Sequence, residues 1–344
     1  MRRLPRLVSA VLFAVGLACS PAQLVGPPPQ DDAGEYDAPF VSDGSLPATN
    51  AVTILVEPGD KGAGILAAIK GATKSIHMTM YLLTNDTIVD ALISQHKAGR
   101  DVKIILNQTF PQGAGTDNAP DYAKLKAAGV PVIWASSQFN YTHEKCVILD
   151  GTIAWIMTMN LTFTSPTDNR EFLAVDTDPN DVAEAEAVFS ADFTGQTPTL
   201  TGRLVVAPVN AHEKLLRLVN EAQTTLDVEG ESFSDQAMED ALITAKQRGL
   251  AVRIVVSDQS PSTAMAKALS DMKGAGILVK KLSVPYIHSK AIVADGVRAY
   301  VGSENFTQNS LDNNRELGLI VADATAVKVL CDTIAKDFAA GVNY

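Results

Sequence analysis

The sequence has few cysteines, no nucleotide-binding loop and, beyond residue 19, no apolar run long enough to cross a membrane. Only Cys146 and Cys331 follow this N-terminal stretch, which excludes a disulfide framework and indicates buried free thiols. The pattern G-x-x-x-x-G-K-[ST] is absent, and no spacing of cysteine and histidine is typical of a metal site. We therefore expect an activity that needs no metal and no other cofactor.

An excess of basic residues is also lacking. The chain has 28 lysines and arginines against 39 aspartates and glutamates, which gives a formal net charge of −11. A surface of this charge repels polyanions, and the sequence contains no lysine–arginine cluster, so nucleic acid is disfavoured as a partner. A small basic pocket within an acidic surface remains compatible with this balance. The length of 344 residues predicts about two domains.

The N-terminal segment is typical of an export signal. Residues 1–19 combine an arginine-rich start with an apolar run of about a dozen residues. The run ends at Cys19 in a sequence that resembles a bacterial lipoprotein signal, in which the cysteine is lipidated. We expect an exported, lipid-anchored envelope protein, with ordinary secretion to the periplasm or beyond as the alternative. Residues 20–50 are rich in proline and acids and contain no lysine or arginine, which predicts a disordered tether.

From residue 51 the sequence alternates between strand and helix patterns. In the first half, strands are expected at 52–56, 75–82, 102–106, 130–135, 146–149, 153–158 and 171–175, and helices at 62–73, 86–98, 121–128 and 181–193. A turn-rich linker at 195–202 follows, and the same order restarts at Arg203. The sequence therefore predicts a tandem duplication of an α/β unit, with repeats at 51–194 and 203–344.

The two repeats share one polar pattern. Residues 141–172 align with residues 286–317 without a gap. The matched pairs are Tyr141 and Tyr286, His143 and His288, Lys145 and Lys290, Asp150 and Asp295, Asn160 and Asn305, Asn169 and Asn314, Arg170 and Arg315, and Glu171 and Glu316. Two copies of one polar constellation predict a single site that is built from both halves.

The residue types in this pattern suit phosphoryl transfer. Side chains alternate along a strand, so His143 and Lys145 share a face, as do His288 and Lys290. If the repeats pack about a pseudo-twofold axis, two imidazoles and two ammonium groups converge. Asn160 and Asn305 can each add an amide donor. Such donors neutralise phosphoryl oxygens without a metal.

Two histidines in one site can divide the work of catalysis. One imidazole attacks phosphorus, while the other, protonated, gives its proton to the leaving alcohol. A buried acid bound to each ring would set its tautomer. Glu171 and Glu316, each 28 residues after the histidine of its own repeat, are the candidates.

These motifs resemble those of the phospholipase D superfamily, which has two H-x-K-x4-D motifs, each followed by G-S-x-N. The second copy matches fully, with Gly302, Ser303 and Asn305, whereas the first has Met157 and Thr158 in place of Gly and Ser. The resemblance covers nearly all of residues 51–344. It implies two mixed sheets flanked by helices, with one active site between pseudo-twofold halves.

The resemblance also implies roles for individual residues. A covalent phosphohistidine would form on His143, with His288 as the general acid. Asp150 and Asp295 would be structural, and the threonine at position 158 would retain the hydroxyl of the serine at position 303.

Several residues allow two interpretations. Asn169-Arg170 and Asn314-Arg315 suit turns and packing as well as substrate contact. Tyr141 and Tyr286 precede each histidine by two positions, so they are candidates for substrate-binding pocket walls and equally for the core. Three histidines have no counterpart in the other repeat and are interpreted as structural: His77, His96 and His212.

The leading hypothesis is an exported phospholipase D that hydrolyses phospholipid headgroups such as that of phosphatidylcholine. The alternatives are phosphatidyl transfer as in cardiolipin synthases, a compact nuclease of the superfamily, and a weakened phosphate- or lipid-binding module, for which the Met157-Thr158 departure is the only support. The expected partners are a phospholipid or other phosphodiester, water or an alcohol acceptor, and a membrane surface. A monomer is expected.

Overall fold

The computed structural model describes residues 46–111 and 117–344. The predicted signal peptide with Cys19 and most of the predicted tether lie outside the described residues. The last residues assigned to the tether, 46–50, are instead part of the folded structure and contact the second repeat. Leu46 is buried in the core of that repeat, and the Thr49 backbone N–H donates to the Ile320 carbonyl at 2.9 Å.

The first repeat contains the elements β1 to α5. Its strands are β1 (Val52–Glu57), β2 (Ser75–Met80), β3 (Asp101–Leu106), β4 (Val132–Trp134), β5 (Lys145–Leu149), β6 (Ile153–Met157) and β7 (Asn169–Asp176). Its helices are α1 (Ala63–Gly71), α2 (Asp86–Lys97), α3 (Ala119–Ala127), α4 (Ser165–Asp168) and α5 (Pro179–Thr194). All strands and helices expected from the sequence are present here, and the short α4 was not predicted.

The second repeat follows the same order. Its strands are β8 (Val205–Ala207), β9 (Thr225–Gly230), β10 (Ala251–Ser257), β11 (Leu278–Leu282), β12 (Tyr286–Ile287), β13 (Lys290–Ala294), β14 (Arg298–Gly302), β15 (Glu316–Val321) and β16 (Val342–Asn343). Its helices are α6 (Ala211–Glu221), α7 (Gln236–Gln247), α8 (Thr263–Gly274), α9 (Gln308–Asp312) and α10 (Ala324–Ala340).

The two sheets have matching topologies. The first has the strand order β1-β7-β6-β5-β2-β3-β4, and the second has β16-β11-β10-β9-β13-β14-β15-β8. In each, three strands joined through helices run parallel, β2-β3-β4 in one and β9-β10-β11 in the other, and the hairpin strands add in antiparallel orientation. This confirms the predicted α/β class with two mixed sheets.

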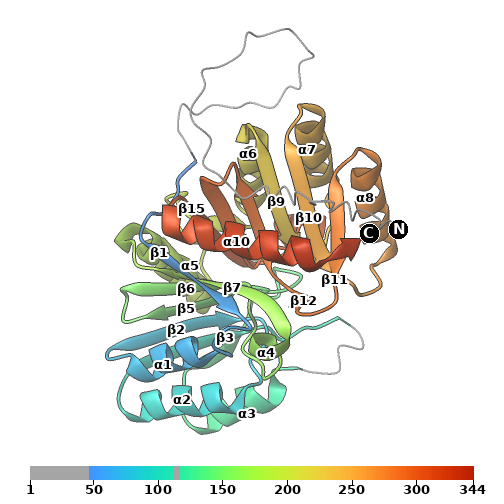
Figure 1. Cartoon of the computed structure of the whole chain (residues 1–344). Coiled ribbons are helices and arrows are strands. Elements are labelled where there is room, and N and C mark those ends of the chain that lie inside the picture. The colour runs from blue at the N-terminus through green and yellow to red at the C-terminus, as the bar shows by residue number, and fades with distance from the viewer. Residues whose placement is uncertain (1–45, 112–116) are drawn as a thin grey trace, which may run out of the picture.

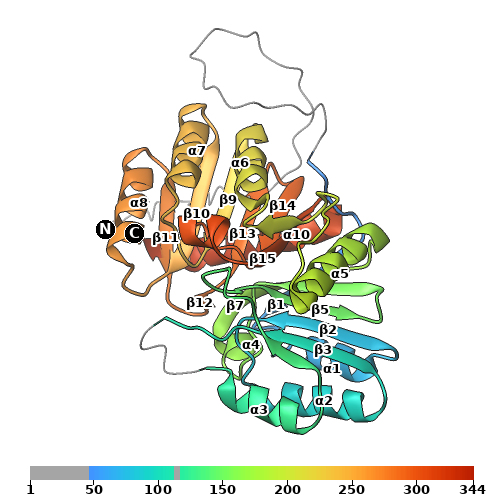
Figure 2. The same ribbon diagram turned by 180° about the vertical axis from the view of Figure 1, so that it is seen from behind.

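The molecule is layered, and its central layer is shared between the repeats. Helices α1–α3 cover the outer face of the first sheet, and α6–α8 cover the outer face of the second (Figures 1 and 2). Between the sheets, α5 and α10 contribute to one apolar cluster that also includes inward-facing residues of both sheets. Both cysteines after residue 19 are buried in this cluster as free thiols, as expected. Among the described helices, none has the length and apolar character required to cross a bilayer.

Candidate active site

Short backbone pairings between the repeats bring the two motifs together. Strand β12 of the second repeat runs parallel to β7 of the first, with Ile287 opposite Arg170. Thr142 forms the equivalent bridge with Arg315. Because each histidine follows such a pairing and each glutamate follows its partner arginine, the histidine of one repeat meets the glutamate of the other.

His143 is held by Glu316 of the opposite repeat. Its Nδ1 lies 2.7 Å from the Glu316 Oε2. The other carboxylate oxygen, Oε1, accepts hydrogen bonds from the Ser310 hydroxyl and from the Asn314 amide at 3.0 Å. This arrangement fixes the imidazole through Nδ1 and leaves Nε2 free for chemistry.

His288 has the reciprocal arrangement with Glu171. The Nδ1 of His288 lies 2.8 Å from the Glu171 Oε1. The Asn169 amide donates to the same oxygen at 3.1 Å, and the Thr158 hydroxyl donates to Oε2. Glu171 and Glu316 therefore are the ring partners that the sequence predicted, but each serves the histidine of the other repeat.

The two lysines make the same contact in the two repeats, each with the backbone of the histidine two residues before it. The Lys145 Nζ donates to the His143 carbonyl at 2.6 Å, and the Lys290 Nζ donates to the His288 carbonyl. Both side chains are almost completely buried, as their places at the starts of β5 and β13 dictate. Each histidine lies just before the strand that its lysine begins, so the predicted shared face is formed by an extended segment and the first strand residue.

The electrostatics of the site favour a neutral His143 facing ionised acids. Burial lowers the pKa of His143, although the charge of Glu316 opposes this. Burial alone would raise the pKa of each glutamate, but the adjacent histidine, the nearby lysine and a hydroxyl hydrogen bond together outweigh it, so the pKa values of Glu171 and Glu316 are lowered. Burial lowers the pKa of Lys145 to about 7, and the charge of Lys290 contributes to the decrease.

Asn160 and Asn305 have unused hydrogen-bonding capacity. Within the described part of the chain, the Oδ1 atom of each is buried without a hydrogen-bond partner. A buried amide with an unpaired polar atom is costly unless a ligand or water completes it. Each Oδ1 atom is therefore an acceptor that a bound donor or a water could complete, and the predicted role of the two amides as donors to a phosphoryl group stays a prediction.

The aspartates of the motifs stabilise turns and do not face the histidines. Asp150 and Gly151 both have positive φ angles, 57° and 65°, in the hairpin turn between β5 and β6. The Asp150 carboxylate accepts the backbone N–H groups of residues 73–75. Asp295 does the same for residues 223–225. This geometry supports the structural role that the resemblance implied.

The arginines of the Asn-Arg-Glu motifs bridge the repeats. Arg170 forms an ion pair with Asp337 of α10, with 2.5 Å between Nε and Oδ2. Arg315 pairs with Asp192 of α5 at 2.8 Å between Nε and Oδ2. Both arginines therefore join one repeat to the other, and the two preceding asparagines hydrogen-bond to the glutamates that contact the histidines.

The remaining sequence candidates separate into two groups. The Tyr286 hydroxyl lies 3.3 Å from the Oε1 of Glu231, a residue that contacts Lys290. The Tyr141 ring packs edge-on, at 85°, against the ring of Tyr81, which contacts His143. His77 and His212 are bound to acids outside the site, as expected of structural histidines. His96 lies on α2.

The departure at Met157 changes packing and not the site. In the second repeat, Gly302 and Gly318 make room for a buried hydrogen bond between Tyr300 and Glu304. The equivalent positions of the first repeat form part of one apolar cluster: Met157, Leu173, Trp155 and Met159. The Thr158 hydroxyl accepts the backbone N–H of Phe172 at 2.9 Å, much as Ser303 accepts that of Leu317 at 3.1 Å. In this contact to the neighbouring strand, Thr158 is therefore the structural counterpart of Ser303.

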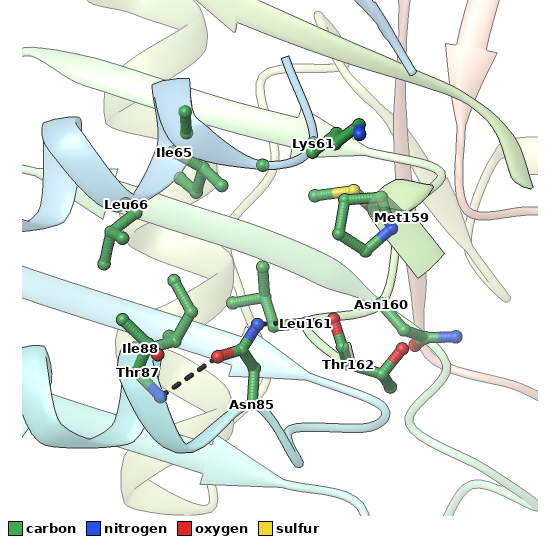
Figure 3. A pocket seen from close by; sticks show the side chains of 13 residues that line it. Lys61, Ile65, Leu66, Asn85, Thr87, Ile88, Met159, Asn160, Leu161 and Thr162 are labelled. Atoms are coloured by element: carbon green, nitrogen blue, oxygen red, sulfur yellow. Dashed lines mark hydrogen bonds between the residues drawn. The ribbon is translucent and has the colours of Figure 1, made fainter. Parts of the chain in front are cut away.

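A cavity of about 250 Å³ adjoins the segment that carries Asn160 (Figure 3). Ile65, Leu66 and Ile88 form an apolar wall, and Asn85 adds a polar group that already accepts the Thr87 backbone N–H at 3.0 Å. In this view the Asn160 amide points away from the apolar wall (Figure 3). Among the site residues predicted from the sequence, Asn160 lines this cavity.

Two residues that the sequence did not single out complete the site. The Tyr81 ring lies 4.5 Å from the His143 ring, between centroids, and 5.0 Å from the Lys145 Nζ. Glu231 lies beside Lys290, with 2.6 Å between Oε2 and Nζ. They occupy equivalent positions, one residue after β2 and β9, but they differ in residue type, so matching of identical residues between the repeats could not identify them.

Comparisons with known proteins match both repeats. The model of a family described as "Cardiolipin synthase, PLD-like domain" matches residues 65–193 and 215–339. Major cardiolipin synthase ClsA of Bacillus subtilis is 24% identical over 341 residues, which cover 84% of this chain and 69% of that protein. Mitochondrial cardiolipin hydrolase of Xenopus tropicalis is 32% identical over 120 residues, which cover 35% of this chain and 57% of that protein. The crystal structure of phosphatidylserine synthase from Haemophilus influenzae has the same fold, with a TM-score of 0.65 and 13% identity over 87% of this chain and 89% of that one.

Proposed function

The chain belongs to the phospholipase D superfamily, and from this membership we propose that it transfers a phosphatidyl group between alcohols in the manner of a cardiolipin synthase. The two reciprocal histidine–glutamate pairs are the observation that carries an enzymatic function. The cardiolipin synthase relatives, which align over most of the chain, support transfer ahead of the headgroup hydrolysis that the sequence favoured. Hydrolysis remains the second candidate, because a cardiolipin hydrolase is among the relatives.

The proposed first step forms a phosphohistidine. The free Nε2 of His143, whose Nδ1 is held by Glu316, attacks phosphorus as the bond from phosphorus to the leaving oxygen breaks. Protonated His288 gives the Nε2 proton to that oxygen, which leaves as an alcohol. Lys145, Lys290 and the asparagine amides stabilise the charge on the non-bridging oxygens.

The second step determines whether the reaction is transfer or hydrolysis. An acceptor hydroxyl attacks the phosphohistidine, His288 takes its proton, and the bond from phosphorus to nitrogen breaks. If the acceptor is the free hydroxyl of a second phosphatidylglycerol, the product is cardiolipin. If the acceptor is water, the product is phosphatidic acid.

The test uses the full chain in detergent with vesicles of phosphatidylglycerol. We expect release of glycerol together with cardiolipin, and loss of both products by at least a thousandfold in His143→Ala and His288→Ala, because each histidine takes part in both steps. His96→Ala, a histidine on α2 outside the site, is the matched control and should retain activity. Phosphatidic acid in place of cardiolipin would favour hydrolysis, and the absence of glycerol release would reject both candidates.

We also propose that the chain is exported and anchored to a membrane through Cys19. The support is the sequence of residues 1–19. Labelling of cells with a radioactive fatty acid should mark the wild-type protein and not Cys19→Ser. Equal labelling of both proteins would contradict the anchor.

A further inference from the structure

The two halves of the site are equivalent in backbone but differ in charge at one position, where one has a neutral ring and the other a carboxylate. Tyr81 follows β2 and contacts Lys145, whereas Glu231 follows β9 and contacts Lys290. The first half therefore presents an aromatic ring beside its lysine, and the second presents a carboxylate. A site that binds an anion would do so best if neither lysine had a carboxylate beside it. The carboxylate next to Lys290 therefore requires a separate explanation.

The Glu231 carboxylate contacts the donors that a phosphoryl group needs in the second half. Its Oε2 lies 2.6 Å from the Lys290 Nζ and 3.5 Å from the His288 Nε2. The Tyr286 hydroxyl lies 3.3 Å from Oε1. The Glu231 side chain is 22% exposed, while that of Lys290 is fully buried, so the carboxylate lies on the open side of the lysine.

Glu231 is negatively charged when the site is at work. Burial alone would raise the pKa of Glu231, but the charges of His288 and Lys290 outweigh it and lower the pKa. A bound phosphoryl group must share Lys290 and His288 with this fixed negative charge. Two like charges within about 4–6 Å repel strongly in a site shielded from water.

We infer that Glu231 sets the charge class of the substrate, so that the site admits a phosphodiester with one negative charge and rejects phosphate groups with two. This inference rests on the proposed function, in which the substrate is a phosphodiester. Lys145 and one protonated histidine suffice to hold a monoanion. A dianion adds a second charge that meets the Glu231 carboxylate, because Lys290 is already compensated.

A consequence concerns the products of the reaction. Phosphomonoesters have a second pKa of about 6, so they are mostly dianions at pH 7. A lipid monoester left by accidental hydrolysis is such a dianion, whereas phosphatidylglycerol and other lipid diesters are not. Glu231 would therefore keep monoesters from occupying the site in competition with diesters.

The test compares two ligands that differ by one methyl group, methyl phosphate and dimethyl phosphate. Binding to the full chain at pH 7 is followed by broadening of the phosphorus NMR signal, which detects weak affinities. We expect the wild type to prefer dimethyl phosphate. Glu231→Gln should shift the ratio of the two affinities toward methyl phosphate by at least tenfold, and Glu231→Tyr, which copies the first half, should do the same.

Glu221→Gln is the matched control, because it removes one carboxylate from an exposed pair with Arg217. It should leave the ratio unchanged. An unchanged ratio in both Glu231 variants, or weaker binding of both ligands, would overturn the inference and assign Glu231 the role of an ion-pair partner for Lys290. Failure of both ligands to bind any variant would overturn it as well.

These results are separable from the proposed function. A wild type that releases no glycerol from phosphatidylglycerol but shows the predicted change in ligand ratio would retain the inference and reject the transferase. Glycerol release by the wild type, with the same ratio of ligand affinities in the Glu231 variants, would reject the inference about Glu231 and leave the proposed function standing.

Discussion

The two buried lysines of the site differ in what compensates their charge. Lys290 pairs with the carboxylate of Glu231, while Lys145 contacts the ring of Tyr81. Burial lowers the pKa of Lys145 to about 7, so its ammonium group is charged below pH 7 and increasingly neutral above it. The first half of the free site therefore loses its positive charge near neutral pH.

This asymmetry predicts the alkaline limb of the pH profile. The value of kcat/KM, which reports the free enzyme, should fall as the pH rises through about 7, because the deprotonated amine no longer stabilises the phosphoryl oxygens. Lys145→Arg should move this limb to higher pH, since a guanidinium stays charged. Profiles of glycerol release for the wild type, Lys145→Arg and Lys290→Arg provide the measurement. A limb that stays in place in Lys145→Arg would contradict the assignment.

Repetition within the sequence was sufficient to predict most residues of the site. Any side chain that the duplication retained, such as His143 and its equivalent, could be found by alignment. Glu231 escaped because its equivalent is Tyr81, so a search for matched polar pairs passes over it. The choice of glutamate for each histidine also escaped, because it depends on how the repeats dock and not on spacing along the chain.

At the scale of single elements, the hairpin between β5 and β6 shows how a motif residue acts without touching substrate. Asp150 has a φ of 57° and caps the backbone N–H groups before β2. Asp150→Ala should lower the free energy of unfolding by about 2–4 kcal/mol, because it removes charged hydrogen bonds and places alanine in a left-handed conformation. Asp150→Asn should cost about half as much, since asparagine tolerates this conformation. Urea unfolding measures both, and equal losses would contradict the contribution of the backbone.

Hydrophobic periodicity predicted the positions of most strands and helices of the first repeat. The features that it missed have a physical cause. Strands such as β3 and helices such as α2 are recognisable because burial of one face determines their pattern. The two-residue strand β12 carries no periodicity and exists only because the other repeat supplies a partner. Likewise, Leu46 is buried by a sheet that is distant in sequence, so composition alone assigned it to the tether.

At the scale of the whole molecule, ion pairs fasten each repeat to a helix of the other. Arg170→Ala would leave Asp337 buried without its partner, so we expect a loss of about 3–5 kcal/mol in the free energy of unfolding. The double variant with Asp337→Ala should recover part of this loss. Arg298→Ala, which breaks an exposed pair with Glu221, is the control and should cost under about 1 kcal/mol. Chemical denaturation of the four proteins makes the comparison, and equal losses for the two single variants would contradict the bridging role.

The pairing of each histidine with the glutamate of the other repeat also determines when, during translation, the site can form. His143 and Glu316 are 173 residues apart along the chain. A ribosome must therefore translate almost the entire protein before His143, the proposed nucleophile, has its partner. A chain that ends before Glu316 lacks the carboxylate that fixes the His143 imidazole, so under the proposed mechanism a prematurely terminated fragment would form no phosphohistidine.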